Sequence, residues 1–84
     1  MGRLRSILDT LLAARSDANT EFSALLYLLQ HLGFERRVKG SHHIFWKSGV
    51  EEILNLQPLG NKAKPYQVKQ VRNLLIKYGL HRQD

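Results

Sequence analysis

Two adjacent histidines, His42 and His43, carry the side chains best suited to acid–base chemistry in this sequence. They open the stretch HHIFWK, directly after a Gly-Ser pair and a basic run. Because the imidazole pKa lies close to neutral pH, a histidine can accept and release protons. If such a base removed the proton of a ribose 2′-hydroxyl, that oxygen could attack the neighbouring phosphate, and nearby cations would hold the developing charge. The pattern is compatible with metal-free cleavage of RNA.

Position favours His42 over His43 as the reacting group. Side chains alternate along a strand, so the two imidazoles point to opposite faces of a sheet. His42 follows Gly40 and Ser41, where the backbone can approach a phosphate closely and offer amide donors. A histidine at the end of a strand can equally be a surface or half-buried residue, and the residues alone leave both interpretations open.

Trp46 also has two interpretations, because a large aromatic side chain can pack in a core or stack on a nucleobase. It shares a strand face with His42 and Ile44, whereas Phe45 lies on the other face. Ile44 and Trp46 compete with Phe45 as core residues. Alternation alone does not decide which face is buried.

We expect neither a metal nor a cofactor. Adjacent histidines on a strand cannot bind one ion together, and His31 and His81 stand in other elements without ligand spacing. The chain has no cysteine. His31, close to the predicted end of a helix, is instead placed to interact with the helix dipole.

Charge points to a polyanionic partner. Thirteen lysines and arginines stand against seven acidic residues, which gives a net charge of +6. Residues 53–83 contain no acidic residue, but they contain Lys62, Lys64, Lys69, Arg72, Lys77 and Arg82. This asymmetry is typical of nucleic-acid binding, although a solvated basic surface that only maintains solubility has the same composition.

The elements that position these residues follow from hydrophobic periodicity and turn signals. Leucines and an isoleucine at helical spacing predict a first helix over residues 3–14, and Gly33 is suited to end a second helix that begins near Thr20. Pro65 is suited to start the last helix. The predicted helices span 3–14, 20–32 and 65–78, and the predicted strands span 34–38, 42–47 and 51–57.

This order predicts one small α+β domain, a three-stranded antiparallel sheet with helices packed on one face. Pro58 should end the sheet, and residues 59–64 should form a flexible basic loop. On the last helix we expect one packed face, with Lys69, Arg72, Asn73 and Lys77 pointing away from the core. No signal peptide or transmembrane segment is expected.

Residues 20–80 resemble the HicA (YcfA-like) toxin family. Three features carry the resemblance: a helix ending in Leu-Gly-Phe, a basic strand leading to Gly-Ser-His with an aromatic residue three positions on, and Lys-x-Lys-Pro opening the last helix. The resemblance implies a fold similar to the double-stranded-RNA-binding domain. It also implies an mRNA interferase that cuts RNA without the ribosome and halts translation, with His42 as the active histidine, neutralised by a HicB-like antitoxin protein.

Together these observations predict a cytoplasmic, metal-independent endoribonuclease toxin, with mRNA as substrate and no membrane or metal partner. Residues 1–19 are expected to be an N-terminal helical extension and residues 20–84 the HicA-like domain. The expected site residues are His42 as catalyst and, for RNA binding, Lys39, Gly40, Ser41, Lys62 and Lys64. Two alternatives are a non-catalytic RNA-binding module and a protein whose basic face binds an acidic partner or DNA.

Overall fold

The computed structural model describes residues 2–82 and contains the predicted elements in the predicted order. The helices are α1 (Arg3–Ala13), α2 (Phe22–His31) and α3 (Pro65–Lys77), with a 3₁₀ turn η1 (Asp17–Asn19). The strands are β1 (Glu35–Lys39), β2 (His42–Lys47), β3 (Val50–Leu56), β4 (Pro58–Leu59) and β5 (Lys62–Ala63). No helix within residues 2–82 is long and apolar enough to cross a membrane.

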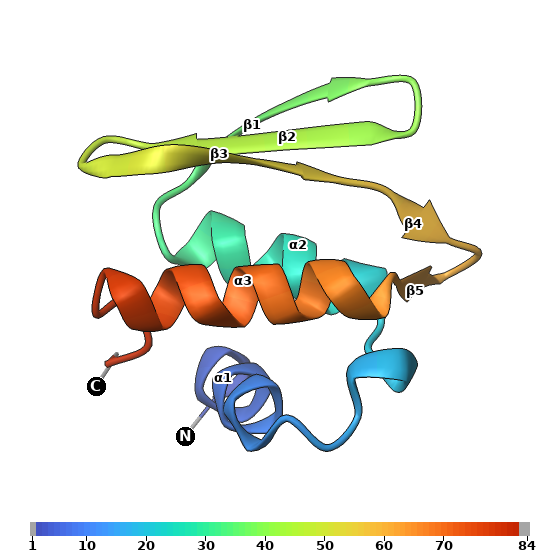
Figure 1. Ribbon diagram of the computed structural model, residues 1–84, viewed down its shortest axis with the longest axis vertical. Coiled ribbons are helices and arrows are strands. Elements are labelled where there is room, and N and C mark those ends of the chain that lie inside the picture. The colour runs from blue at the N-terminus through green and yellow to red at the C-terminus, as the bar shows by residue number, and fades with distance from the viewer. Residues whose placement is uncertain (1, 83–84) are drawn as a thin grey trace.

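The fold is α+β, as predicted, with a three-stranded antiparallel sheet in the order β1-β2-β3. All three helices lie on one side of this sheet (Figure 1): α2 and α3 form the layer next to it, and α1 lies on their far side. The opposite face of the sheet carries no helix. The question of which face is buried is therefore answered by the side on which the helices pack.

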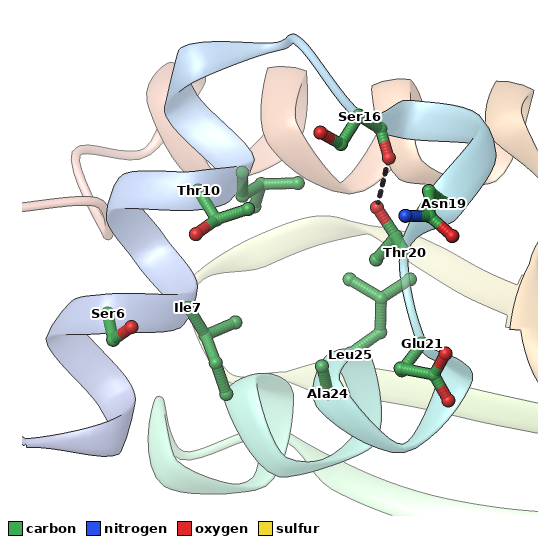
Figure 2. Close-up of a pocket in the computed structure, with 10 residues that line it drawn as sticks. Ser6, Ile7, Thr10, Ser16, Asn19, Thr20, Glu21, Ala24 and Leu25 are labelled. Carbon is green, nitrogen blue, oxygen red and sulfur yellow. Dashed lines mark hydrogen bonds between the residues drawn. The ribbon is translucent and has the colours of Figure 1, made fainter.

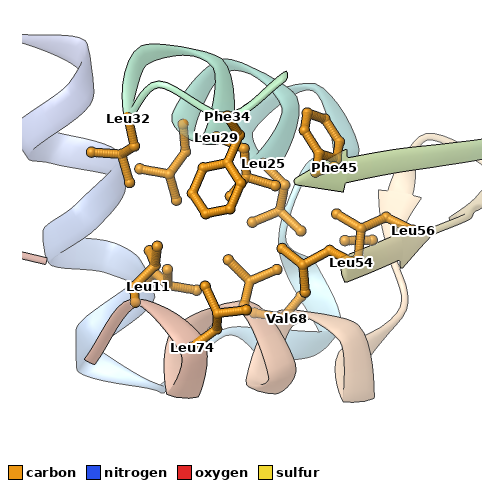
Figure 3. Packing of buried hydrophobic residues seen from close by; sticks show 14 of the residues in the cluster. Leu11, Leu25, Leu29, Leu32, Phe34, Phe45, Leu54, Leu56, Val68 and Leu74 are labelled. Atoms are coloured by element: carbon orange, nitrogen blue, oxygen red, sulfur yellow. The ribbon is translucent and has the colours of Figure 1, made fainter. Parts of the chain in front are cut away.

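Phe45 on β2 and Leu54 and Leu56 on β3 point into the core, where all three are fully buried. Figure 3 shows them against leucines of α2 and Val68 of α3. Since side chains alternate, His42, Ile44 and Trp46 belong to the uncovered face. The burial of apolar side chains between the sheet and two helices is what fixes the orientation of the histidine strand.

Glycines end the helices that flank the sheet. Gly33 has a φ of 91°, and the Phe34 N–H donates to the Leu29 carbonyl at 3.0 Å. This six-residue backbone hydrogen bond satisfies a carbonyl at the end of α2, and a left-handed residue is required for it. The predicted role of Gly33 is confirmed, and the chain turns there directly into β1.

The prediction of a flexible loop over residues 59–64 is wrong. Pro58 and Leu59 pair with Lys62 and Ala63 in a short antiparallel hairpin. The hairpin is held to the N-terminal region, since the Ala63 N–H donates to the Thr20 carbonyl at 2.8 Å. Proline does not prevent this pairing, because it stands at the first position of a two-residue edge strand.

The first helix is part of the core. Leu8 and Leu11 of α1 are buried in the same hydrophobic cluster as the residues of the sheet. Arg72 of α3 forms a two-pronged ion pair with Asp17, at 2.9 and 3.1 Å, and also donates to the Leu11 carbonyl at 3.3 Å. The expectation that Arg72 points away to solvent is wrong: its charge is used to hold α1 and η1 against α3. The boundary between residues 19 and 20 stays a prediction.

The other end of α3 is tied to β3. The Lys77 ammonium lies 2.7 Å from the Glu52 carboxylate, and the Tyr78 hydroxyl donates to the same carboxylate at 2.5 Å. The hydrogen bonds from Lys77 and Tyr78 lower the pKa of Glu52 to about 2. The Tyr78 oxygen also accepts from the Glu51 N–H at 3.2 Å, so the C-cap residue of α3 contacts the backbone of β3.

Candidate active site

His42 is the first residue of β2 and stands at the tight turn that joins β1 to β2. Gly40 in this turn has a φ of 61°, a conformation that glycine adopts at no steric cost. Lys39 is directly opposite His42 in the strand register. The His42 side chain is exposed on the uncovered face, because Phe45 on the same strand points to the helices. An extended polymer can reach this imidazole without any movement of a helix.

Asn55 on β3 holds the His42 ring. The His42 Nδ1 lies 3.0 Å from the Asn55 Oδ1. An amide oxygen only accepts hydrogen bonds, so Nδ1 carries the proton and the Nε2 of the neutral ring keeps its lone pair. Asn55 therefore selects the tautomer in which Nε2 is the basic atom. This is the arrangement that a general base requires.

Gln57 joins the turn before His42 to the start of α3. Its side-chain N–H donates to the Ser41 hydroxyl at 3.0 Å, and its side-chain oxygen accepts from the Lys64 ammonium at 3.3 Å. Lys64 is only partly exposed and forms the N-cap position of α3. The structure thus brings Ser41 and Lys64 together at the end of the sheet that carries His42.

Gln67 of α3 binds the backbone of β3 from the helix side, at the end of the sheet that carries His42. It is 4% exposed. Its side-chain oxygen accepts from the Gln57 backbone N–H at 3.1 Å, and its side-chain N–H donates to the Asn55 carbonyl at 3.2 Å. Gln67 therefore completes the backbone hydrogen bonding of β3 at the two residues whose side chains contact His42 and Ser41.

The other two predicted lysines differ in their surroundings. Lys39 is exposed, and no acidic residue among residues 2–82 forms an ion pair with it. Lys62 forms an ion pair with Glu21 at the start of α2, where the two residues also share an isolated β-bridge. Glu21 neutralises much of the Lys62 charge, so Lys39 and Lys64 offer more to a phosphate. An RNA-binding role for Lys39, Lys62 and Lys64 stays a prediction.

His43 belongs to the opposite face, where it packs. Its ring meets the Phe22 ring edge-on, with centroids 5.0 Å apart, and its Nδ1 is buried without a hydrogen-bond partner. Burial, and next the charge of Arg36, lower the pKa of His43 below its usual value. Because side chains alternate along β2, His43 packs on the helix side and is not a partner of His42 in the site.

The remaining histidines lie apart from this network. The His31 Nδ1 is 2.8 Å from the Tyr27 carbonyl near the end of α2, and its ring stacks on Tyr27. His31 stands in the last turn of α2, and its interaction with the helix dipole stays a prediction. Within residues 2–82, no three histidine, cysteine, aspartate or glutamate side chains gather in a way that could hold a metal ion.

A pocket of about 200 Å³ lies elsewhere, between α1, η1 and the start of α2 (Figure 2). Ile7 and Leu25 form part of its apolar wall, and hydroxyl groups such as that of Thr10 line its rim. Thr20 in this rim donates to the Ser16 carbonyl at 3.0 Å. None of the residues that line the pocket belongs to the His42 network, so the pocket is separate from the candidate active site.

A comparison with protein-family models identifies the family. The model described as the HicA toxin of bacterial toxin–antitoxin systems matches residues 22–80, which is most of the chain. The chain belongs to the HicA toxin family. No curated protein and no solved structure matches it significantly, so the likeness to the double-stranded-RNA-binding domain stays a prediction.

The HicA match runs from the start of α2 to just beyond α3 and contains the whole network around His42. Helix α1 and the turn η1 precede it. A HicA toxin is one half of a toxin–antitoxin pair, and the partner of this chain is accordingly an antitoxin.

Three residues of the candidate active site, Asn55, Gln57 and Gln67, were not predicted from the sequence. A signal for Asn55 existed: alternation along residues 51–57 places it on one face with Gln57, and a hairpin between β2 and β3 brings that face to His42. The register between Phe45 and Lys47 is irregular, which sets Asn55 opposite Ile44 rather than opposite His42. Gln67 gave no such signal, because its partners are on another element.

Proposed function

We propose that this HicA toxin is a metal-independent mRNA interferase, an endoribonuclease of the cytoplasm that inhibits translation without the ribosome. The observation that supports the proposal best is the hydrogen bond between His42 Nδ1 and Asn55 Oδ1 on the uncovered sheet face. It leaves Nε2 as an exposed base at the end of a strand, beside a turn and cations suited to a phosphodiester.

The proposed reaction begins with transfer of the ribose 2′-hydroxyl proton to His42 Nε2. The 2′-oxygen then forms a bond to the adjacent phosphorus, and the bond from phosphorus to the 5′-oxygen breaks. The leaving 5′-oxygen takes a proton from water, and the hydroxide that remains takes the proton held by His42, which restores the neutral imidazole. The products are a 2′,3′-cyclic phosphate and a 5′-hydroxyl end, so no metal ion is required by the chemistry.

Lys39 and Lys64 are proposed to bind the phosphate, and Lys62 to contribute more weakly because Glu21 shares its charge. Gly40 and Ser41 shape the turn on which the phosphate rests, and Gln57 fixes Ser41 in that turn. A HicB-like antitoxin is proposed to neutralise the toxin by covering this end of the sheet, where the site is otherwise open to solvent.

The test compares the purified chain with two variants, His42→Ala and His31→Ala, on labelled single-stranded RNA in excess EDTA. Loss of a general base typically lowers the rate about 10² to 10⁴-fold, so His42→Ala should lose most cleavage. Both substitutions replace exposed histidines, and only His42 belongs to the network. His31→Ala should therefore cut like the parent.

Two further results decide between cleavage and binding alone. A substrate with 2′-deoxyribose at every position should remain intact, because the attacking oxygen is missing. An alanine variant of His42 that cuts as fast as the parent would remove the proposed catalyst. Binding of RNA by all three proteins with no product over time would instead support a non-catalytic RNA-binding module.

A further inference from the structure

Trp46 lies on the uncovered face of the sheet, on the same strand as His42. On β2, Phe45 is fully buried toward the helices. The Lys47 ammonium lies beside Gly33 at the end of α2, 2.8 Å from the place of a Cβ on that glycine. Both neighbours of Trp46 thus point to the helix side. Alternation places the indole on the opposite face, the one that carries no helix.

The indole contributes little to the core. Neither Trp46 nor Ile44 belongs to the hydrophobic cluster or to the partly buried side chains packed against it. The indole N–H forms no hydrogen bond with any residue from 2 to 82. A buried tryptophan usually finds a partner for this group. Ile53 on β3 is 64% exposed. The face therefore carries apolar side chains outside the core cluster, of which Trp46 and Ile44 are half-buried and Ile53 is exposed.

Basic side chains stand next to these apolar ones. In the register of β1 and β2, Arg37 is opposite Ile44 and Lys39 is opposite His42. Both cations are exposed, and neither forms an ion pair within residues 2–82. One carboxylate, that of Glu35, is opposite Trp46 at the far end of the strand pair. Between the indole and the imidazole the face is thus positively charged.

Distance along the strand links the two aromatic residues. His42 and Trp46 are four positions apart, which is about 13 Å at the rise of a β-strand. The pairing of β2 with β3 is irregular next to Trp46: between the pairs Phe45–Leu54 and Lys47–Val50, this one residue faces residues 51–53, so the extra residues belong to β3. A short run of nucleotides reaches from one residue to the other across Arg37.

We propose that Trp46 stacks on a nucleobase of the single-stranded RNA substrate, a few nucleotides from the bond that His42 cleaves, while Arg37 and Lys39 contact the phosphates between them. The proposal rests on the proposed nuclease function and adds a binding subsite to it. Every base has a π-face, so stacking here gives affinity with little sequence preference. The positive charge of Arg37 and Lys39 attracts a polyanion, so it favours a nucleic acid as the occupant over a protein surface with few acidic residues.

The chain offers an internal probe, because Trp46 is its only tryptophan. The full chain with His42→Ala is titrated with a mixed-sequence oligoribonucleotide and with an abasic strand of the same length. Binding is followed by the anisotropy of a label on the nucleic acid. Quenching of the indole fluorescence by the oligoribonucleotide, but not by the abasic strand at saturation, is the expected result. Unchanged fluorescence at saturating RNA would overturn the proposal.

Kinetics test the same subsite in the chain that retains His42. Trp46→Ala removes the proposed stacking residue and should raise KM roughly tenfold to a hundredfold with kcat nearly unchanged. Trp46→Phe should restore most of the affinity that Trp46→Ala loses. Ile76→Ala is the control, since it removes an exposed apolar side chain from α3 and should not change KM.

The outcomes separate the subsite from the nuclease. If Trp46→Ala and Trp46→Phe both keep the parent KM while His42→Ala abolishes cleavage, the subsite is wrong and the nuclease function stands. If RNA quenches the indole but the parent does not cut, the stacking stands and the nuclease function fails. If Trp46→Ala loses only the antitoxin, the face is a protein interface and the proposal is overturned.

Discussion

Replacing Gln67 by leucine should destabilise the protein by about 2 kcal/mol. The leucine fills the volume of the buried side chain, but it removes the acceptor of the Gln57 N–H and the donor to the Asn55 carbonyl. A net hydrogen bond contributes about 0.5–1.5 kcal/mol, so loss of two gives about 1–3 kcal/mol. For a domain of this size, about 2 kcal/mol lowers the melting temperature by roughly 8–16 °C.

Urea unfolding followed by Trp46 fluorescence measures this difference, since the midpoint and slope give the free energy of unfolding. Gln70→Leu is the matched control. Gln70 stands on the same helix but is exposed, and the change should alter stability by less than about 0.5 kcal/mol. Equal unfolding free energies for the two leucine variants would refute the reasoning that Gln67 completes the hydrogen bonding of β3.

Three further variants probe the core and two ionisable groups. Leu8→Ala should cost about 2–5 kcal/mol in the same urea assay, because Leu8 is 0% exposed, whereas Leu59→Ala, at a position 63% exposed, should cost little. Burial lowers the pKa of His43, so the unfolded chain binds its proton more readily, and stability should fall as the pH drops below about 6.5. His43→Phe should remove that fall. The hydrogen bond from Lys77 lowers the pKa of Glu52 to about 2, so the stability that the ionised Glu52 contributes should be lost as the pH falls from about 4.5 to 2. Glu52→Gln should reduce the loss of unfolding free energy over this pH range.

Local patterns predicted most of the elements. The last helix was expected over 65–78 and spans Pro65–Lys77, and the histidine strand was expected over 42–47 and spans His42–Lys47. Proline at a helix start, glycine at a helix end and the period of apolar residues act over a few positions, so they can be interpreted from one segment. The position of His42 beside a glycine turn belongs to the same class of local signal.

Long-range contacts were not predictable in the same way. Alternation groups Phe45 against Trp46, but only the packing of α2 and α3 decides which group is buried. The sequence places Arg72 on an exposed basic face of the last helix. In the structure it pairs with Asp17, which lies in a turn 55 positions earlier. Gln67 likewise has its partners on β3. Each of these pairs depends on where other elements pack, which the periodicity of a single segment does not encode.

The docking of α1 on α3 has a consequence for the time at which the toxin becomes complete. The Leu11 carbonyl and Arg72 are separated by 61 positions, so α1 leaves the ribosome well before α3 and meets its partner only after that intervening stretch has been made. Until then the apolar stripe of α1 has no α3 to cover it, and closing such a long loop is slow compared with local folding. A chain that lacks Arg72 therefore cannot make this contact, and the leucines of α1 that it leaves uncovered favour aggregation.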